Sequence, residues 1–332
     1  MLLARNSRVE SQLQPQVWQI TIRQIILLEG ALALIQHVAL VSESNLCKMN
    51  DLLRVSAAMQ KQASRDLAPI WDVSATVDVF AKLQDVPDGY WPMVIRDNIG
   101  YSAAGIHIDK DGQPFALIAA SDSVDKWSLT ASHEMCEMVV DPSGNRQETG
   151  DSPKPGQGRV SFLVEVCDPS EAADFAYSVN GILVSDFFTP NYFDPVTASG
   201  VRYSYTGAIT APRQVLRGGY LSWKDSVDGH WWQQSWFDGG APTFRDIGAR
   251  DAKSASIRGF VDRLTAQRTA QAIDRGRVTA QSAGLTVAQA QKSLTGNATM
   301  WRQQISEILG RPSTRHGSAK KVAKKAAPKK KA

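Results

Sequence analysis

The chain has 332 residues, of which 43% are hydrophobic and 21% charged, and this length allows one large domain or two smaller ones. Its three cysteines are too few and too scattered for a disulfide framework, which suits a reducing compartment. Nine basic residues and no acidic residue lie in residues 311–332, whereas the rest of the chain holds 28 basic and 33 acidic residues. The basic character therefore belongs to the tail. The rest of the chain has a net negative charge, so we do not expect it to bind phosphate groups.

An apolar stretch at residues 25–41 is interrupted by Glu29 and His37. Polar side chains at these positions fit neither a membrane-spanning helix nor a secretory signal, and no clean cleavage site of small residues follows. We therefore treat residues 1–36 as an N-terminal extension, and we expect no membrane span and a cytoplasmic location.

The sequence from residue 38 onward predicts strands and one helix ahead of the first motif. Apolar runs predict strands at residues 38–41, 75–80, 90–95, 105–108 and 115–119. Apolar residues at helical spacing predict an amphipathic helix over residues 46–67.

The next helix-like run, residues 127–140, places His133, Glu134 and Glu137 in an H-E-x-x-E pattern. Because a helix turns by about 100° per residue, His133 and Glu137 share one face and Glu134 lies about a quarter turn away. In H-E-x-x-H enzymes the two residues four apart bind zinc, and the glutamate acts as general base on the metal-bound water. Zinc also accepts carboxylate oxygen, so the pattern predicts a Zn²⁺ site, with another divalent metal as the alternative.

Two glutamates on a surface helix are the competing interpretation of this pattern. The apolar side chains around it favour a buried helix instead, whose acidic groups need a partner. These apolar residues are Met135, Met138, Val139 and Val140.

A third ligand is expected from residues 162–169, which are predicted to form a buried strand that ends in a polar turn. Glu165 is the first candidate and Asp168 the second. The two point to opposite faces of a strand, so both can approach one metal only if the strand ends early, as its closing proline suggests. Asp141, eight residues after His133 on nearly the same helical stripe, is the third candidate. A turn cap or a salt bridge is an equally good interpretation of each one alone.

Three sequence segments together resemble the signature of zincin-type metallopeptidases of the H-E-x-x-E subtype. They are His133-Glu134-x-x-Glu137, the following Asp141-Pro142, and Glu165-Val-Cys-Asp168. Residues from about 38 to 248 also resemble a family of uncharacterised bacterial proteins that carry the same helix. The resemblance implies a zincin-like mixed sheet, metal ligation by His133 and Glu137, and Glu134 as general base acting on a peptide or protein substrate. The chain departs from it in having no second histidine in the motif and no H-x-x-G-x-x-H extension.

Other segments predict structure around this site. Residues 142–158 are rich in glycine and proline and predict an exposed loop, and an Asn-Gly pair predicts a hairpin in residues 177–184. The tryptophan-rich residues 223–237 predict core packing, with polymer recognition as the alternative. His107 and His230 are candidates for oxyanion or proton donors, and a purely structural histidine is the alternative for each.

The sequence thus predicts four regions in an α+β protein. They are the extension at residues 1–36, a zincin-like metal-binding domain at 37–245, a helical region at 246–310 and a disordered Lys-rich tail at 311–332. The tail would attract nucleic acid or another acidic surface, or simply increase solubility. We expect a metal-dependent hydrolase of the zincin-like peptidase type; the alternative is a non-catalytic metal-containing protein that binds a polymer or nucleic acid through the tail.

Overall fold

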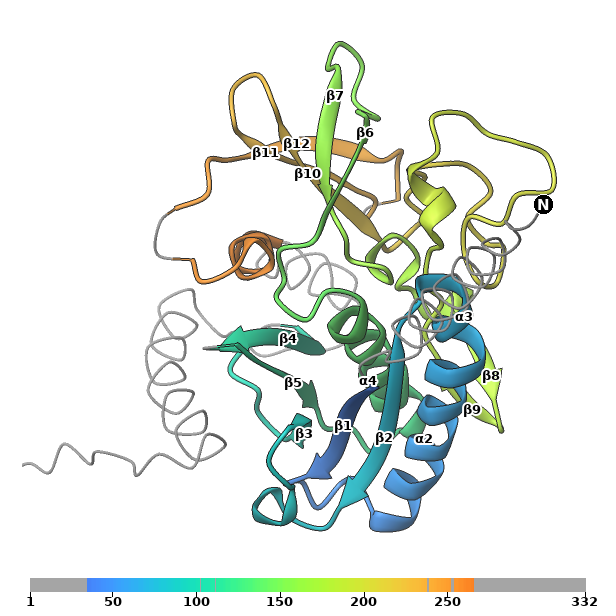
Figure 1. Cartoon of the computed structure of the whole chain (residues 1–332), viewed down its shortest axis with the longest axis vertical. Helices are drawn as coiled ribbons and strands as arrows, with labels where there is room; N and C mark the ends of the chain where they lie inside the picture. Colours follow the sequence, from blue (N-terminus) through green and yellow to red (C-terminus); the bar gives the residue numbers. More distant parts are fainter. Residues whose placement is uncertain (1–34, 102, 111, 238, 252–253, 266–332) are drawn as a thin grey trace, which may run out of the picture. The chain divides into compact units, whose positions relative to one another are not determined.

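The computed structural model describes residues 35–265, except for residues 102, 111, 238, 252 and 253. The basic tail, residues 1–34 of the predicted N-terminal extension and most of the predicted helical region lie outside this part, so they stay predictions. Within the described part the chain combines several β-sheets with a few helices (Figure 1), and the α+β class is confirmed at this level.

Five strands form the first sheet, which we call sheet A: β1 (Ile35–Ser42), β2 (Ser74–Phe80), β3 (Tyr90–Arg96), β4 (Gly105–Lys110) and β5 (Gln113–Ala119). Their order is β2-β1-β3-β5-β4, with β4 antiparallel to β5 and the other neighbours parallel. The middle of β1 is a continuous buried run, as expected for a parallel sheet with both faces covered. All five predicted strands of this region are confirmed.

Two long helices pack on sheet A and contact each other. α2 (Met49–Lys61) lies against β1 and β2, and α4 (Val124–Val140) lies against β4 and β5. A π-helical turn (Gln62–Leu67) and the short α3 (Ala68–Trp71) continue α2, which confirms the predicted first helix. Short 3₁₀ turns lie at Leu83–Asp85, Asp168–Ser170, Ala173–Phe175 and Pro190–Phe193. Among the described residues, no helix has the length and hydropathy that crossing a bilayer requires.

A second, antiparallel sheet, sheet B, has the order β12-β11-β10-β7-β6. Its strands are β6 (Gln147–Asp151), β7 (Arg159–Leu163), β10 (Tyr220–Asp225), β11 (Trp231–Ser235) and β12 (Thr243–Gly248). The prediction of a loop throughout residues 142–158 was wrong at β6, because this edge strand is polar and largely exposed and so carries no apolar alternation. Trp223 and Trp231 are buried, so the core interpretation is confirmed for these two.

The predicted hairpin is formed by β8 (Tyr177–Val179) and β9 (Ile182–Val184). Asn180 and Gly181 have φ values of 52° and 77°, as a type I′ turn requires at both central positions. The hairpin packs on α4, where the Ser128 hydroxyl donates to the Leu183 carbonyl at 2.8 Å. This contact fixes the helix that carries the H-E-x-x-E motif.

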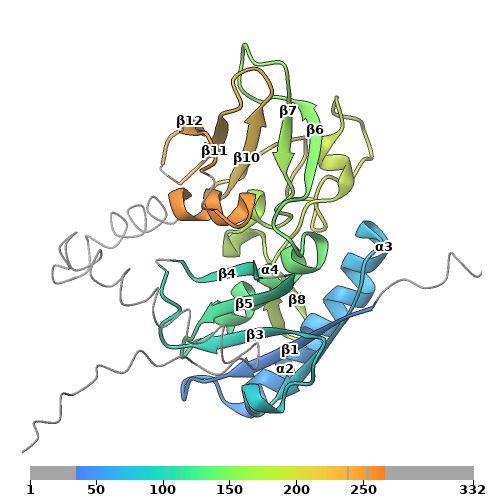
Figure 2. The same cartoon turned by 60° about the vertical axis from the view of Figure 1, so that its left-hand side comes forward.

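The described part ends in a helix at residues 257–265, drawn in orange between sheet B and β4 in Figures 1 and 2. Ile257, Phe260 and Val261 pack against Leu163 and Tyr220 of sheet B. The predicted boundary between residues 245 and 246 falls inside β12, and this helix folds back onto the elements that precede it.

Candidate metal centre

α4 begins after Ser123, whose backbone is extended, and ends at Asp141. The Asp141 carboxylate accepts hydrogen bonds from the backbone N–H groups of Asn145 at 3.1 Å and Arg146 at 2.8 Å. These bonds close the turn that follows the helix, which is the capping alternative considered for Asp141. Both carboxylate oxygens are thereby committed to the backbone.

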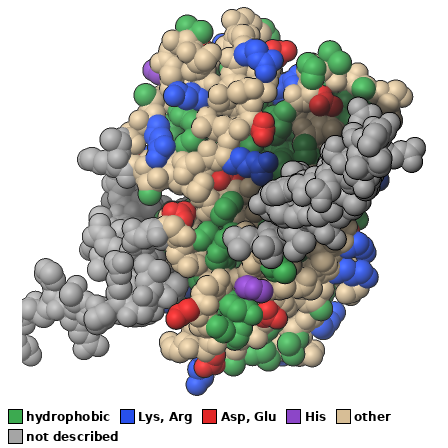
Figure 3. Space-filling view, in the orientation of Figure 1, with side chains coloured by type: hydrophobic (Ala, Val, Ile, Leu, Met, Phe, Trp, Pro, Cys, Tyr) green, Lys and Arg blue, Asp and Glu red, His purple; other side chains and the backbone are tan. Residues whose placement is uncertain are grey.

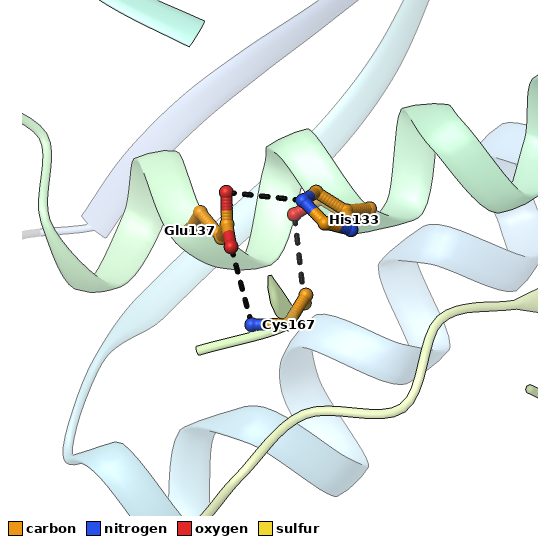
Figure 4. A group of neighbouring side chains, drawn as sticks. All are labelled: His133, Glu137 and Cys167. Carbon is orange, nitrogen blue, oxygen red and sulfur yellow. Dashed lines mark hydrogen bonds and ion pairs between the residues drawn. The ribbon is translucent and has the colours of Figure 1, made fainter. Parts of the chain in front are cut away.

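His133 and Glu137 meet on one face of α4, as their spacing predicts. His133 Nε2 lies 3.2 Å from Glu137 Oε2, and the other Glu137 oxygen accepts the Cys167 N–H at 3.2 Å (Figure 4). Glu137 is fully buried, whereas the His133 side chain is 12% exposed. The helix therefore holds one carboxylate inside the protein and directs one imidazole toward its surface.

Asp168 approaches the same imidazole from a second segment. β7 ends at Leu163, so the chain has left the strand before Glu165, and a 3₁₀ turn begins at Asp168. Asp168 Oδ1 lies 3.3 Å from His133 Nε2. Gly219 makes this turn possible, because a Cβ at that position would lie 2.5 Å from the Asp168 carbonyl oxygen.

These distances suit a metal centre. Two ligand atoms bound to one zinc ion at about 2.0–2.1 Å, at a tetrahedral angle, lie about 3.3 Å apart, which matches each of the two contacts of His133 Nε2. The ligand atoms of His133, Glu137 and Cys167 lie within 4.8 Å of one another, as do those of His133, Asp168 and Glu171, so His133 is the ligand that the two groups share. Burial lowers the pKa of His133, but Glu137 and Asp168 outweigh it and raise the pKa well above the ordinary value. These two carboxyl groups thus favour a positive charge at the ring, and a metal cation can take the place of its proton.

Glu165, the first candidate for the third ligand, lies on the other side of Glu137. Its Oε2 contacts the guanidinium of Arg258, and it shares a group of closely spaced ligand atoms with His107 and Glu137. The structure therefore brings Asp168, and not Glu165, to His133.

Glu134 lies between the two sides of this cluster. Its Oε2 is 3.4 Å from His107 Nδ1 and 3.5 Å from Arg258 Nη2, and it lines a cavity together with His133. Gly105 on β4 allows the close packing, since a Cβ there would lie 2.6 Å from Glu134 Oε1. His107, a candidate donor from the sequence, thus joins the site, whereas His230 pairs with Asp246 at 2.9 Å on sheet B.

The cavity has a volume of about 460 Å³, which is in the range of small-ligand pockets, roughly 300–1,000 Å³. His133, Glu134 and Asp168 form part of its polar wall. The apolar wall includes Tyr101, Ile106, Leu129, Tyr220 and Phe237. His133, Asp168 and the proposed base Glu134 therefore open onto one space, with Glu137 buried behind them.

Sequence reasoning missed Glu171, Arg258 and Asp262, which also line the cavity. Glu171 follows the candidate ligand Asp168 by three residues. This short spacing was a usable signal that Glu171 belongs to the site. Arg258 and Asp262 are an i,i+4 pair at 3.1 Å in the helix at residues 257–265. Nothing in the sequence linked that pair to α4.

The site holds more acidic than basic groups. Burial, together with Glu137, raises the pKa of Asp168 well above its usual range, and burial is the main cause that raises the pKa of Glu171 to about 8. Burial also raises the pKa of Asp262. Glu137 differs, because Arg258 and His133 outweigh its burial and lower its pKa. Carboxylates crowded in this way require protons or a further cation.

Comparisons of the chain with protein-family models, with curated proteins and with solved structures found no match. The α+β architecture rests on the described helices and strands, and the zincin resemblance stays a prediction. The function has to be inferred from the site itself.

Proposed function

We propose that the protein is a metal-dependent hydrolase of the zincin-like peptidase type, in which His133, Glu137 and Asp168 hold a divalent cation, most simply Zn²⁺. One observation carries the proposal. A single imidazole nitrogen at the edge of a cavity lies 3.2 and 3.3 Å from carboxylate oxygens of two separate segments. A nitrogen and two oxygens are a donor set that zinc accepts, and a catalytic zinc site keeps one further position open.

A cation held there would polarise a water molecule and the carbonyl group of a substrate. Glu134 is the general base in this proposal, because its carboxylate lines the same cavity and is 3% exposed. It would take a proton from the attacking water and return it to the leaving amine. His107, 3.4 Å from Glu134 Oε2, would orient the carboxylate for this transfer.

The cavity supports a peptide or another amide as substrate. Tyr220 and Phe237 on its apolar wall can hold an apolar group of the substrate. The scissile carbonyl would then lie beside His133 and Glu134, which line the same cavity. Cleavage of a library of fluorogenic peptides would identify the preferred sequence.

Two substitutions test the proposal on the purified full chain. His133→Ala should lose the bound metal, whereas Glu134→Gln should keep it and lose peptide hydrolysis, because only the first removes a ligand. His230→Ala is the matched control, since His230 is an exposed histidine paired with Asp246, and it should change neither property. A wild-type chain without divalent metal, or hydrolysis that survives Glu134→Gln, would refute the proposal.

A further inference from the structure

A second group of ligand atoms lies on the other side of Glu137. It consists of His107 from β4, Glu137 from α4 and Glu165 from the segment after β7, with one atom from each within 4.8 Å of the others. All three side chains are buried, with 1%, 0% and 6% of their surfaces exposed. The group shares only Glu137 with the centre at His133 and Asp168.

Two members of this group are buried without complete hydrogen bonding. Neither ring nitrogen of His107 has a hydrogen-bond partner among the described residues, and neither does Glu165 Oε1. His107 Nδ1 lies 3.4 Å from Glu134 Oε2 and 3.7 Å from Glu137 Oε2, and its Nε2 makes no such approach. Leaving buried polar atoms without hydrogen bonds destabilises the fold, so their presence in this group points to a ligand.

Arg258 already brings positive charge to this group. Its Nη1 lies 2.5 Å from Glu137 Oε2 and contacts Glu165 Oε2, and its Nη2 lies 3.5 Å from Glu134 Oε2. The backbone at Arg258 is anchored to the turn after α4, because the Arg258 N–H donates to the Gly144 carbonyl at 2.9 Å. The guanidinium thus partly neutralises the carboxylates, but it leaves both ring nitrogens of His107 without a hydrogen bond.

We propose that His107, Glu137 and Glu165 form a second binding site for a divalent cation, and that the guanidinium of Arg258 occupies it in this structure. A guanidinium has only hydrogen-bond donors and a single charge. A divalent cation would take a lone pair from His107 and an oxygen from each glutamate, which is the mixed nitrogen and oxygen set suited to zinc. Arg258 and a divalent cation therefore compete for the same carboxylates.

Sharing of Glu137 would place the two cations side by side, as in hydrolases that use two metal ions. With Arg258 docked, the centre combines one metal ion and one guanidinium. With Arg258 withdrawn, it would combine two metal ions. The second site does not depend on the proposed function, because His133 and Asp168 take no part in it.

Counting Zn²⁺ ions per chain tests the proposal. Arg258→Met removes the charge and keeps an extended side chain, so the full-length variant should bind one Zn²⁺ more than the wild type in equilibrium dialysis. Adding His107→Phe to this variant should remove the extra ion. Arg263→Met is the matched control, because Arg263 lies in the same helix but is about half exposed and pairs with Asp251, and its zinc content should equal that of the wild type.

The outcomes separate the two proposals. An extra ion in Arg258→Met that survives His133→Ala supports the second site, even if the wild type binds none. If Arg258→Met binds no more zinc than the wild type, the second site is overturned. This holds even if the wild type carries one ion that His133→Ala removes. Circular dichroism shows which variants fold; if Arg258→Met does not, Arg258→Gln, which is neutral but keeps hydrogen-bond donors, is assayed against the same outcomes.

Discussion

Asp66 and the cluster around Glu137 are two buried acidic centres that differ in their surroundings. Asp66 accepts hydrogen bonds from Tyr177 at 2.9 Å and Tyr205 at 2.7 Å, and it contacts Arg65. The wider cluster around Glu137 instead holds more carboxyl groups than basic side chains. Donors complete the first centre, so it can be purely structural, whereas the second requires positive charge that a bound cation can supply.

The largest expected effect comes from a change at Asp168. Asp168→Asn removes one of the two carboxylates beside His133 Nε2, and Zn²⁺ affinity should fall by more than about 100-fold, since a change at an outer partner of a metal ligand already costs about 10–100-fold. Glu165→Gln is the matched variant, because Glu165 lies next to Arg258, and it should weaken binding far less. Competition with a chromogenic chelator measures both affinities. A larger loss in Glu165→Gln would return the role of third ligand to Glu165.

Removal of the negative charge of Asp66 should lower the stability of the folded protein. Burial raises the pKa of Asp66, but the hydrogen bonds from Arg65, Tyr205 and Tyr177 outweigh it, and the net pKa is below its usual value. Asp66→Asn should therefore lower the free energy of unfolding at about pH 7 by about 1–3 kcal/mol. Zinc content should not change.

The pH dependence of this effect follows from the direction of the shift. Because the pKa of Asp66 is lower in the folded state, its stabilisation is complete above the unfolded pKa of about 3.9 and is lost as the pH falls through the folded value. Urea titrations should thus show a difference between wild type and Asp66→Asn that shrinks from about pH 7 to about pH 3. A constant difference would mean that the carboxylate charge is not the stabilising element.

Gly105 tests how closely the acidic cluster is packed. In Gly105→Ala, the new Cβ would lie 2.5 Å from Thr130 Cγ2 and 2.6 Å from Glu134 Oε1, so β4 and α4 must separate. We expect a loss of about 1–3 kcal/mol in stability, together with slower peptide hydrolysis. Gly158→Ala is the control, because a Cβ there meets nothing within 4 Å. Equal melting temperatures for the two variants would contradict the packing argument.

Deletion of residues 311–332 should leave both acidic centres unchanged. On the face shown in Figure 3, acidic and basic side chains of the described residues are interspersed, without a continuous basic patch. Any affinity for a DNA duplex should therefore disappear with the tail, along with its salt dependence. Zinc content and melting temperature should stay at wild-type values. Undiminished DNA binding by the shortened chain would place the nucleic-acid site elsewhere.

The parts of the site that were predictable share one property: each is determined by residues that are close together in the sequence. Helical spacing alone placed His133 and Glu137 on one face, and the Asn-Gly pair alone defined the hairpin beside α4. The choice between Glu165 and Asp168 was not predictable, because it depends on where β7 ends. The turn at Asp168 that follows this end also needs the close approach of Gly219, about fifty residues later in the chain.

The role of Arg258 could not be predicted from the sequence for a related reason. It meets Glu137 across 121 residues and Glu165 across 93, and only the tertiary packing of its helix on sheet B brings it there. A lone arginine in an Arg-rich segment carries no local sign of this role. The polar edge strand β6 shows the same limitation, since its pairing with β7 is what makes it a strand.

The position of Arg258 also sets an order of events during biosynthesis. Glu134, Glu137 and Glu165 leave the ribosome between 93 and 124 residues ahead of the guanidinium that contacts them. A nascent chain that has emerged only as far as residue 245 holds these carboxylates without that counter-charge, so it cannot bury them together unless protons or metal ions take the place of the arginine. Metal supply in the cell would then influence how the newly made chain folds, before any substrate is met.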